Sequence, residues 1–332
     1  SSKKLLKLSE KDLKLKSINS HIEGNLDEAE KGYITFLKNG FSDADIFSNY
    51  ALICEGRGET DKAIKLYERC TSHFPKHVFS KINLSFLYYK LNDFNKAELL
   101  IEDAIKLKPD LPNGYCIRGL ILKSLNKYDE SKYSFEKAIE IDPNYIDAYI
   151  NLGLLNKDFN NYIDAEKYYL KAIEINNKSA IAHLNLGACY KDILELDKAI
   201  IHTEKAIILD SNLENSYLNL ATIHSQKGNY VESLSLAKKE LSINKDSELC
   251  YQHISELIKA NGILNLSEKE NKEILYNILI RKDISHRELF GNINEIISSE
   301  ILEALSRFEF EVESSKEFNI LIQEREVIKS LS

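Results

Sequence analysis

Five asparagines recur at one position of a 34-residue period in this sequence. They are Asn49, Asn83, Asn151, Asn185 and Asn219. A side-chain amide carries two N–H donors and one carbonyl acceptor, so a row of amides can hydrogen-bond the N–H and C=O groups of an extended peptide. Asparagine is a poor helix former, so helix propensity does not explain the row. The row predicts binding of a peptide backbone; the alternative is that the amides bond neighbouring helices and only tie the repeats together.

Two columns of small residues indicate the elements that hold these asparagines. The first column lies two residues after the asparagine position: Ser17, Ala51, Ser85, Gly119, Gly153, Gly187 and Ala221. The second column follows twelve residues later: Ala29, Ala63, Ala97, Ser131, Ala165, Ala199 and Ser233. Two such columns at a fixed separation predict two helices that cross closely once per repeat, where only a small side chain fits.

Turn and stop signals complete the repeat. The column between the two helices holds residues suited to the left-handed backbone that ends a helix, with one leucine as the exception: Gly24, Gly58, Asn92, Asn126, Asn160, Leu194 and Gly228. Prolines that block helix continuation follow the second helix at Pro75, Pro109 and Pro143. Each unit is therefore predicted to be a helix, a tight turn, a helix and a stop.

This pattern resembles the tetratricopeptide repeat (TPR) family at the small columns, at the closing prolines and at second-helix aromatics such as Tyr67, Phe135 and Tyr169. The resemblance implies an all-α fold, a right-handed α-solenoid of seven helix-turn-helix repeats. The expected repeats are residues 10–43, 44–77, 78–111, 112–145, 146–179, 180–213 and 214–247. Residues 1–9 would be an N-terminal extension, 248–261 a capping helix, and 262–332 a mostly helical C-terminal segment.

The resemblance also implies where a ligand binds, because the first helices of this family line a concave groove. The asparagine row is similar to the asparagine ladder in the repeats of O-linked N-acetylglucosamine transferases, which holds a peptide backbone. The same column reaches His253 in the expected capping helix. Asp158 and Asp192 are further groove-facing candidates, and they suit a ligand that is neutral to basic.

Arg118 interrupts the pattern in the fourth repeat, where it occupies a column otherwise rich in leucine. A buried guanidinium needs a partner or a route to solvent, so we expect it to pair with Asp147 or Asp158 or to reach water. If it faces the groove, it could grip a carboxylate or backbone carbonyls of the ligand. The alternative is a structural arginine on the seam between repeats.

Other kinds of chemistry are disfavoured by the sequence. A clamp of basic residues for a C-terminal carboxylate would need lysines one residue before the asparagine column, and only Lys14 is basic there. His73 and His77 have the spacing of helical metal ligands, but Pro75 lies between them. Neither Cys116 nor Cys189 has a histidine base in register. We therefore expect no catalytic residue, no metal and no cofactor, and a protein that is not an enzyme.

Composition limits the partners and the compartment. The chain has 29% charged and 43% hydrophobic residues, and its net charge of −8 opposes nucleic-acid binding. Five cysteines without a C-x-x-C pair fit a reducing compartment. No apolar run is long enough to cross a membrane, and no export signal is visible. We expect a cytoplasmic protein that binds a protein or peptide in extended conformation, with no nucleic acid and no membrane.

The C-terminal segment loses the period. Helix starts are predicted at the capping boxes Ser267–Glu270 and Ser285–Glu288, and residues 307–314 alternate like a half-buried strand. This segment could join two copies of the chain. It also resembles the region that follows the repeats in some large bacterial TPR proteins with a transferase domain. The leading interpretation is an interaction scaffold; the alternative is the substrate-recognition arm of a methyltransferase-, sulfotransferase- or glycosyltransferase-like enzyme whose catalytic domain lies outside this chain.

Overall fold

The computed structural model describes residues 9–261, 274, 277 and 278. Within these residues it contains fifteen α-helices and no strand. The two predicted capping boxes, the predicted strand at residues 307–314 and the proposed self-association through residues 262–332 lie outside the described part of the chain, apart from those three residues. In the described part, no helix combines the length and the apolar character needed to cross a membrane.

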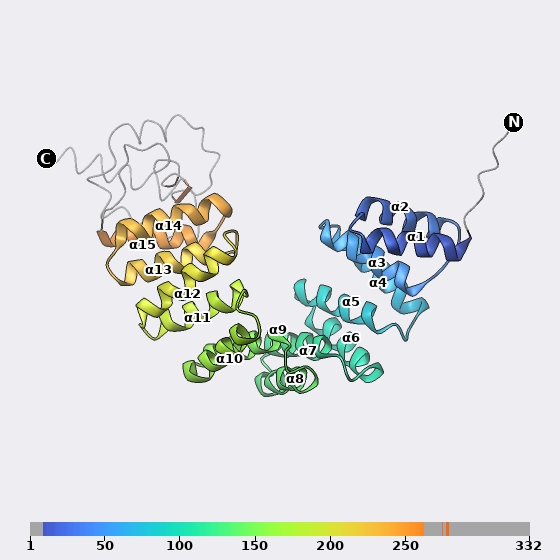
Figure 1. Ribbon diagram of the computed structural model, residues 1–332, viewed down its shortest axis with the longest axis horizontal. Coiled ribbons are helices and arrows are strands. Elements are labelled where there is room, and N and C mark those ends of the chain that lie inside the picture. The colour runs from blue at the N-terminus through green and yellow to red at the C-terminus, as the bar shows by residue number, and fades with distance from the viewer. Residues whose placement is uncertain (1–8, 262–273, 275–276, 279–332) are drawn as a thin grey trace, which may run out of the picture. The chain divides into compact units, whose positions relative to one another are not determined.

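The helices follow one another in pairs, as Figure 1 shows. They are α1 (Glu10–Ile22), α2 (Leu26–Lys38), α3 (Ala44–Gly56), α4 (Thr60–His73), α5 (Val78–Lys90), α6 (Phe94–Leu107), α7 (Pro112–Ser124), α8 (Tyr128–Ile141), α9 (Ile146–Asp158), α10 (Tyr162–Ile175), α11 (Ala180–Asp192), α12 (Leu196–Leu209), α13 (Ser216–Gln226), α14 (Tyr230–Ile243) and α15 (Glu248–Asn261). The odd-numbered helices α1 to α11 begin at the residues where the repeats were expected to begin.

The turns between paired helices have the predicted left-handed backbone. All seven residues of the turn column have positive φ: Gly24 80°, Gly58 75°, Asn92 61°, Asn126 60°, Asn160 58°, Leu194 62° and Gly228 79°. A branched residue such as leucine seldom adopts this conformation. Leu194 shows that the repeat geometry, and not the residue type alone, determines the turn.

The two small columns form the closest contact inside each pair of helices. A Cβ atom built on Gly153 would lie 2.4 Å from the ring of Tyr169, and one on Gly119 would lie 2.4 Å from the ring of Phe135. Three serines of these columns donate their hydroxyls across the contact: Ser131 Oγ to the carbonyl of Gly119 at 2.7 Å, Ser85 Oγ to that of Ala97 at 2.8 Å and Ser233 Oγ to that of Ala221 at 2.7 Å. Both columns are buried, so they fix how the two helices of a repeat cross.

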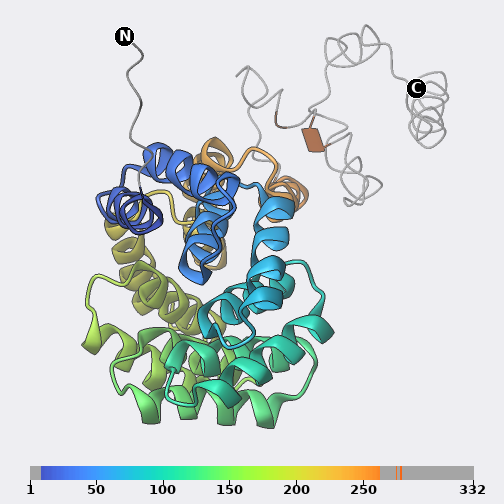
Figure 2. The same cartoon turned by 90° about the vertical axis from the view of Figure 1, so that its right-hand side faces the viewer.

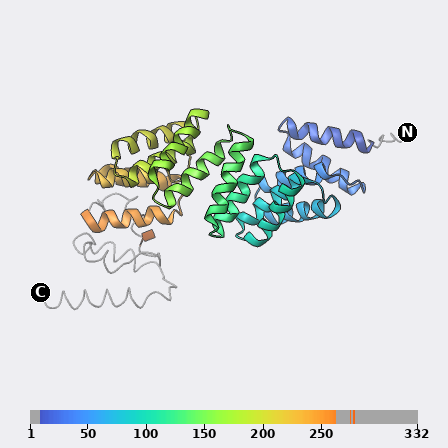
Figure 3. The same ribbon diagram turned by 90° about the horizontal axis from the view of Figure 1, so that it is seen from below.

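The chain divides into two compact units, residues 1–209 with α1 to α12 and residues 210–332 with α13 to α15. In the first unit, each odd-numbered helix contacts the next odd-numbered helix as well as its own partner. Figure 1 shows α5, α7 and α9 on one side of this stack and α6, α8 and α10 on the other, and Figure 2 and Figure 3 show the same order of pairs from two other directions. The odd-numbered helices therefore form one continuous layer.

The second unit departs from the repeat pattern at a buried glutamate. Glu240 is fully buried, at a position where the four preceding repeats have alanine. Its carboxylate accepts the backbone N–H groups of Asn215 at 2.8 Å, Tyr217 at 3.2 Å and Leu218 at 3.3 Å. A carboxylate at a helix N-terminus satisfies N–H groups that have no partner within the helix. This cap accompanies a start of α13 at Ser216, two residues later than predicted.

The expected capping helix is itself covered. In α15, Tyr251, Ile254, Ser255 and Ile258 lie on one side of the helix and are all buried. Ile274 and Ile278 belong to the same hydrophobic core as α14 and α15. Asn277 Nδ2 also donates to the Tyr251 hydroxyl at 3.2 Å. Helix α15 is therefore an internal element of the second unit.

A pair of histidines joins α11 to α12. The Nδ1 atoms of His183 and His202 lie 3.1 Å apart, with ring centroids separated by 5.3 Å. This distance allows one N–H to lie between the two nitrogens, so one ring donates and the other accepts. Burial lowers the pKa of both imidazoles, and the charge of His183 further lowers that of His202. The folded state is therefore most stable when both rings are neutral.

Replacing Glu240 with alanine restores the repeat pattern, yet we expect it to destabilise the protein. The change leaves three N–H groups at the start of α13 without their acceptor, which should lower the free energy of unfolding by about 2 to 4 kcal/mol. Glu232→Ala removes an exposed glutamate from the same helix and should cost about 0.5 kcal/mol. Denaturant unfolding of both variants tests this, and a Glu240→Ala protein as stable as the parent would contradict the capping role.

A low pH should destabilise the contact between His183 and His202 that joins α11 to α12. Because the folded-state pKa values of His183 and His202 lie below the unfolded value of about 6.5, the unfolded chain binds more protons below that pH. Above pH 6.5 the neutral pair makes its full contribution to the free energy of unfolding. As the pH falls below 6.5, the free energy of unfolding decreases by on the order of 1 kcal/mol. The variant His183→Tyr/His202→Tyr copies Tyr149 and Tyr168 of the preceding repeat. Unfolding measured from pH 8 to pH 5 should be less pH-dependent in this variant; identical profiles would refute the assignment.

Candidate functional site

One face of each first helix remains open to solvent. In α3, Asp45, Leu52 and Gly56 are exposed and Asn49 is half-buried, whereas most of the intervening residues are buried. Spacings of four, three and four residues place these four side chains on the same side of a helix. The asparagine therefore lies on the exposed face of its helix, as the sequence predicts.

The same four positions are accessible in the next four first helices. We call the combined surface the first-helix face. Its members, helix by helix, are Asp45, Asn49, Leu52 and Gly56; Phe79, Asn83, Phe86 and Lys90; Asn113, Ile117, Leu120 and Ser124; Asp147, Asn151, Leu154 and Asp158; Ile181, Asn185, Ala188 and Asp192. Since these helices contact one another in order, the face is continuous over α3, α5, α7, α9 and α11.

Two asparagines lie beside a tyrosine of the preceding repeat. Asn83 Nδ2 donates to the Tyr67 hydroxyl at 3.3 Å. Burial raises the pKa of Tyr33 to about 12, and the side chain of Asn49 beside its hydroxyl partly offsets this shift. In both pairs the tyrosine lies sixteen residues before the asparagine. The amides do tie repeats together, but each bond uses only one of the groups of the amide.

Asn151 bonds differently because the equivalent residue before it is Phe135, which has no hydroxyl. Its Nδ2 donates to the carbonyl of Asp147 at 2.8 Å and lies 3.5 Å from Cys116 Sγ. Burial raises the pKa of the Cys116 thiol to about 12, so it is a neutral packing residue. Asn151 is thus held in place by its own helix and by α7.

Asn185 differs from Asn83 and Asn151 in its hydrogen bonding. Its side chain makes no hydrogen bond within the part of the chain that the structure describes, although it is half-buried. The tyrosine sixteen residues earlier, Tyr169, has a buried hydroxyl without a hydrogen-bond partner among the described residues. Unpartnered buried polar groups are uncommon in proteins. Asn185 is therefore free to bond either this hydroxyl or a ligand.

Two asparagines of the first unit share an orientation that decides what they can bind. Asn83 and Asn151 each use the Nδ2 group as donor to the protein. Their carbonyl oxygens accept no hydrogen bond from the described residues. Since an amide oxygen can accept two hydrogen bonds, these two positions offer acceptors to a ligand. A peptide N–H or a cationic side chain satisfies them.

Two predicted site residues lie in the second unit. Asn219 is a half-buried residue of α13. His253 is buried, with only 8% of its surface exposed, and its Nε2 lies 2.9 Å from Ser233 Oγ. Because Ser233 donates its hydroxyl proton to the carbonyl of Ala221 at 2.7 Å, His253 donates to Ser233. The prediction of His253 as a surface ligand residue is therefore wrong: it packs against the small-residue contact.

Arg118 points away from the first-helix face. Its Nε donates to Glu102 Oε1 at 2.5 Å and its Nη1 to Ser134 Oγ at 2.7 Å. Glu130 lies 4.0 Å from Nη2. These three partners are on the second helices α6 and α8, so the predicted pairing with Asp147 or Asp158 is wrong. The Arg118 side chain is 18% exposed, and its guanidinium links α6 to α8 at the junction between two repeats.

Asp158 and Asp192 form ion pairs at the C-terminal ends of the first helices. Lys123 Nζ lies 2.6 Å from Asp158, and Lys157 Nζ lies 2.9 Å from Asp192. Each lysine is one repeat before its aspartate, and Lys191 continues the lysine column, 3.8 Å from Asp192. Sequence reasoning selected the aspartates and missed the lysines, although they recur at the same period of 34. These pairs leave little net negative charge for a ligand at this edge.

One group of potential metal ligands occurs among the described residues, formed by Glu30, Cys54 and Glu59. The ammonium of Lys62 lies 2.7 Å from Glu59 and 3.3 Å from Glu30. Burial also raises the pKa of the Cys54 thiol, which opposes the thiolate form that binds metals. The lysine supplies the positive charge that this group needs, so we assign it a structural role.

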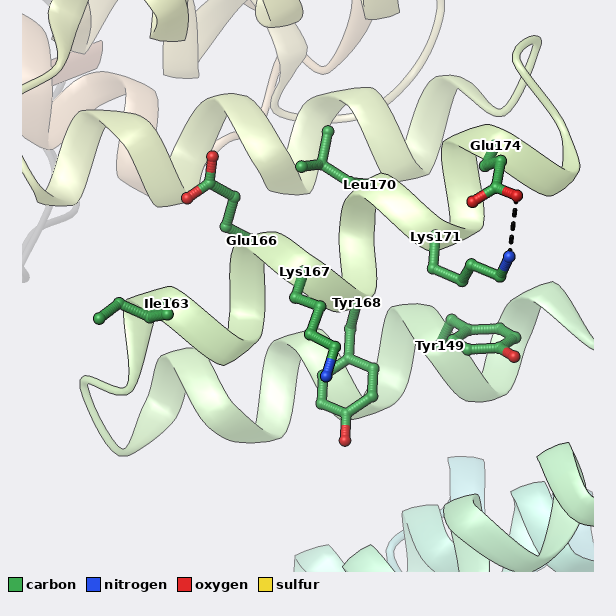
Figure 4. A pocket seen from close by; sticks show the side chains of 8 residues that line it. All are labelled: Tyr149, Ile163, Glu166, Lys167, Tyr168, Leu170, Lys171 and Glu174. Carbon is green, nitrogen blue, oxygen red and sulfur yellow. Dashed lines mark hydrogen bonds and ion pairs between the residues drawn. The ribbon is translucent and has the colours of Figure 1, made fainter.

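A shallow pocket lies on the opposite side of the repeat stack. It is lined by Tyr149 of α9 and by α10 side chains from Ile163 to Glu174. Figure 4 shows Ile163 and Leu170 among charged neighbours, with Lys171 paired to Glu174. The pocket contains none of the predicted site residues. It belongs to a second helix, and the first-helix face remains the candidate site.

Family models match three parts of the chain. A model described as TPR repeat matches residues 119–158, and one described as tetratricopeptide repeat matches residues 80–111 and 146–179. Comparison of the sequence with curated proteins gave no match.

Several solved structures share the fold. A tetratricopeptide repeat protein from Parabacteroides merdae ATCC 43184 has a TM-score of 0.63 at 19% identity, over 75% of this chain and 98% of that chain. The APC/C hetero-tetramer Cut9-Hcn1 has a TM-score of 0.61 at 12% identity, over 89% of this chain and 55% of that chain. A monomeric IFIT1 mutant with Gppp-AAAA has a TM-score of 0.61 at 16% identity, over 88% and 72%. These likenesses concern the fold.

The position of Arg118 predicts that Arg118→Leu leaves ligand binding unchanged, because the guanidinium is on the seam and not on the first-helix face. Leucine restores the repeat pattern, so the free energy of unfolding should change by less than about 1 kcal/mol. Glu102→Gln should destabilise more, by about 1 to 2 kcal/mol, since it leaves a mostly buried guanidinium without its closest carboxylate. Denaturant unfolding and partner affinity are measured for both variants. Weaker binding by Arg118→Leu would show that the arginine contacts the ligand.

Proposed function

Because the chain is a tetratricopeptide repeat protein, we propose that its first-helix face binds an extended segment of a partner protein. The TPR fold is one that protein-interaction scaffolds use, and its layer of first helices offers a surface longer than a single pocket. The observation that carries the proposal is the row of Asn49, Asn83, Asn151 and Asn185, placed on the exposed faces of α3, α5, α9 and α11.

The orientation of the amides supports a peptide backbone as the ligand. Asn83 and Asn151 direct their N–H groups into the protein and keep a carbonyl oxygen for another donor. An extended peptide has a regular series of backbone N–H groups that can meet such acceptors. Hydrogen bonds of this kind hold the main chain of the ligand.

The electrostatics favour a protein over a nucleic acid. The chain has a net charge of −8, and the lysines at the edge of the first-helix face are paired with Asp158 and Asp192. Nucleic-acid binding needs unpaired cations to replace the counterions of the phosphates. The face instead combines neutral amides with the exposed carboxylates Asp45 and Asp147, which suits a neutral to basic segment.

The experiment begins with a cross-linked pull-down from native lysate and continues with the recovered partner segment. Asn185→Ala is the most informative single variant, because this amide has no internal hydrogen bond to lose. We expect an unchanged melting temperature and an affinity about 3- to 10-fold lower, the effect of one hydrogen bond. Asn83→Ala should lower both affinity and stability, since it also loses the bond to Tyr67.

Asn95→Ala serves as the control, because Asn95 is an exposed residue on the second helix α6. It should affect neither property. The variant with alanine at Asn49, Asn83, Asn151, Asn185 and Asn219 gives the decisive comparison. Full partner recovery with a lowered melting temperature would assign the row to repeat stability and reject the proposed function.

A further inference from the structure

The first-helix face carries a second row beside the asparagines. Its members are apolar and lie three residues after each position of the asparagine column: Leu52, Phe86, Leu120, Leu154 and Ala188. We call this set the apolar row. Leu52 is 41% exposed and the other members are half-buried. An apolar side chain in every one of five successive first helices is a continuous surface on which ligand side chains can be buried.

The spacing of the rows limits the conformation of an extended ligand that runs across the helices. Packed helices lie about 8 to 10 Å apart. An extended chain advances about 3.1 to 3.3 Å per residue, so about three residues of ligand correspond to one repeat. In a β-strand, residues three apart point to opposite faces. In a polyproline II helix, which has three residues per turn, they point to the same face.

The hydrogen-bonding groups agree with the same conformation. A polyproline II segment has no internal hydrogen bonds, so its N–H groups remain available. The carbonyl oxygens of Asn83 and Asn151 can each accept one of them. These two asparagines are two repeats apart, because α7 has Ile117 at this position, so they would meet N–H groups two ligand turns apart. Proline has no N–H, so the residues that meet the asparagines cannot be proline. The ligand is therefore polyproline II in shape without being a run of proline.

Helix α5 provides the strongest anchor on the face. Phe86 stacks on Tyr89 with ring centroids 6.0 Å apart, and Lys90 Nζ lies 4.6 Å from the centroid of Phe86. Phe79, 50% exposed, lies on the same side of the helix. Ring packing of this kind holds an aromatic side chain in one orientation and presents it to a ligand. The ligand residue opposite α5 should be the most restricted in type.

The charges on the first-helix face determine which charged residues the ligand can carry. Asp45 and Asp147 are exposed at the N-terminal edge of the face. Asp45 is bonded by Lys14 at 3.1 Å, whereas Asp147 has no ion pair with a described residue. At the opposite edge the lysines and aspartates neutralise each other. A basic ligand residue beside α9 is favoured, and acidic residues there are disfavoured.

We propose that the bound segment is a polyproline II stretch of a partner protein, with an apolar side chain at every third residue seated on the apolar row and a basic residue near Asp147. This inference rests on the proposed function and adds the sequence pattern that the face selects. It commits to a period of three in the ligand, which differs from the period of two that a β-strand ligand would show.

The test uses a phage-displayed library of random dodecapeptides, each long enough for about four repeats at three residues per repeat. The full chain should enrich peptides with apolar residues at three-residue intervals. A synthetic peptide with this pattern is then compared with one in which a single apolar residue is moved by one position. We expect the shifted peptide to bind at least 10-fold more weakly, and this comparison needs no protein variant.

Protein variants locate the binding surface. Leu120→Ser/Leu154→Ser should abolish the enrichment, whereas Ile163→Ser, which changes an 82% exposed side chain on the opposite side of the stack, should leave it intact. Circular dichroism confirms that each variant is folded. Peptides enriched with alternate apolar residues, or enrichment that survives the apolar-row variant, would overturn the inference while leaving the proposed function in place. Absence of any enriched peptide would reject both.

Discussion

The close approach of two helices in every repeat is the constraint on which the rest of the structure depends. A side chain at Gly153 would collide with the ring of Tyr169 at 2.4 Å, and the small residues facing it are buried in every repeat. This contact fixes the rotation of each first helix about its axis. The same side of α3, α5, α7, α9 and α11 therefore remains open to solvent, and residues 34 apart become neighbours on one face.

Much of the fold could be predicted because its determinants recur or act locally. The small columns and the turn residues mark the helix starts, and α1 to α11 begin where the period places them. Leu194 adopts φ of 62° although leucine is unsuited to it, so the period was a better guide there than the residue type. The asparagine row was also visible in the sequence, because its members share a column and the exposed face follows from that column.

The residues that were misjudged depend on partners that a column does not encode. Arg118 bonds Glu102 and Ser134 on the second helices. The length of the arginine side chain and the position of nearby carboxylates determine these partners. His253 has the register of the asparagines, yet α15 is packed on two sides and buries it. Glu240 occupies a column that holds alanine in the four preceding repeats. Its carboxylate accepts the backbone N–H of Asn215 and so caps the start of α13. Asn83 and Asn151 bond different partners because Tyr67 has a hydroxyl and Phe135 has none, a signal that the sequence does contain.

The first-helix face thus combines amide acceptors, an apolar row and paired charges on helices whose orientation the repeat contact fixes. We propose that this face binds one extended segment of a partner protein. Photo-cross-linking can test this binding, with benzoylphenylalanine placed in turn at Leu52, at Leu154 and, as a control, at Ile163. We expect adducts from Leu52 and Leu154 that map to one continuous partner peptide, roughly nine residues apart for three repeats. Adducts from Ile163 alone, or adducts from Leu52 and Leu154 on unconnected parts of the partner, would contradict it.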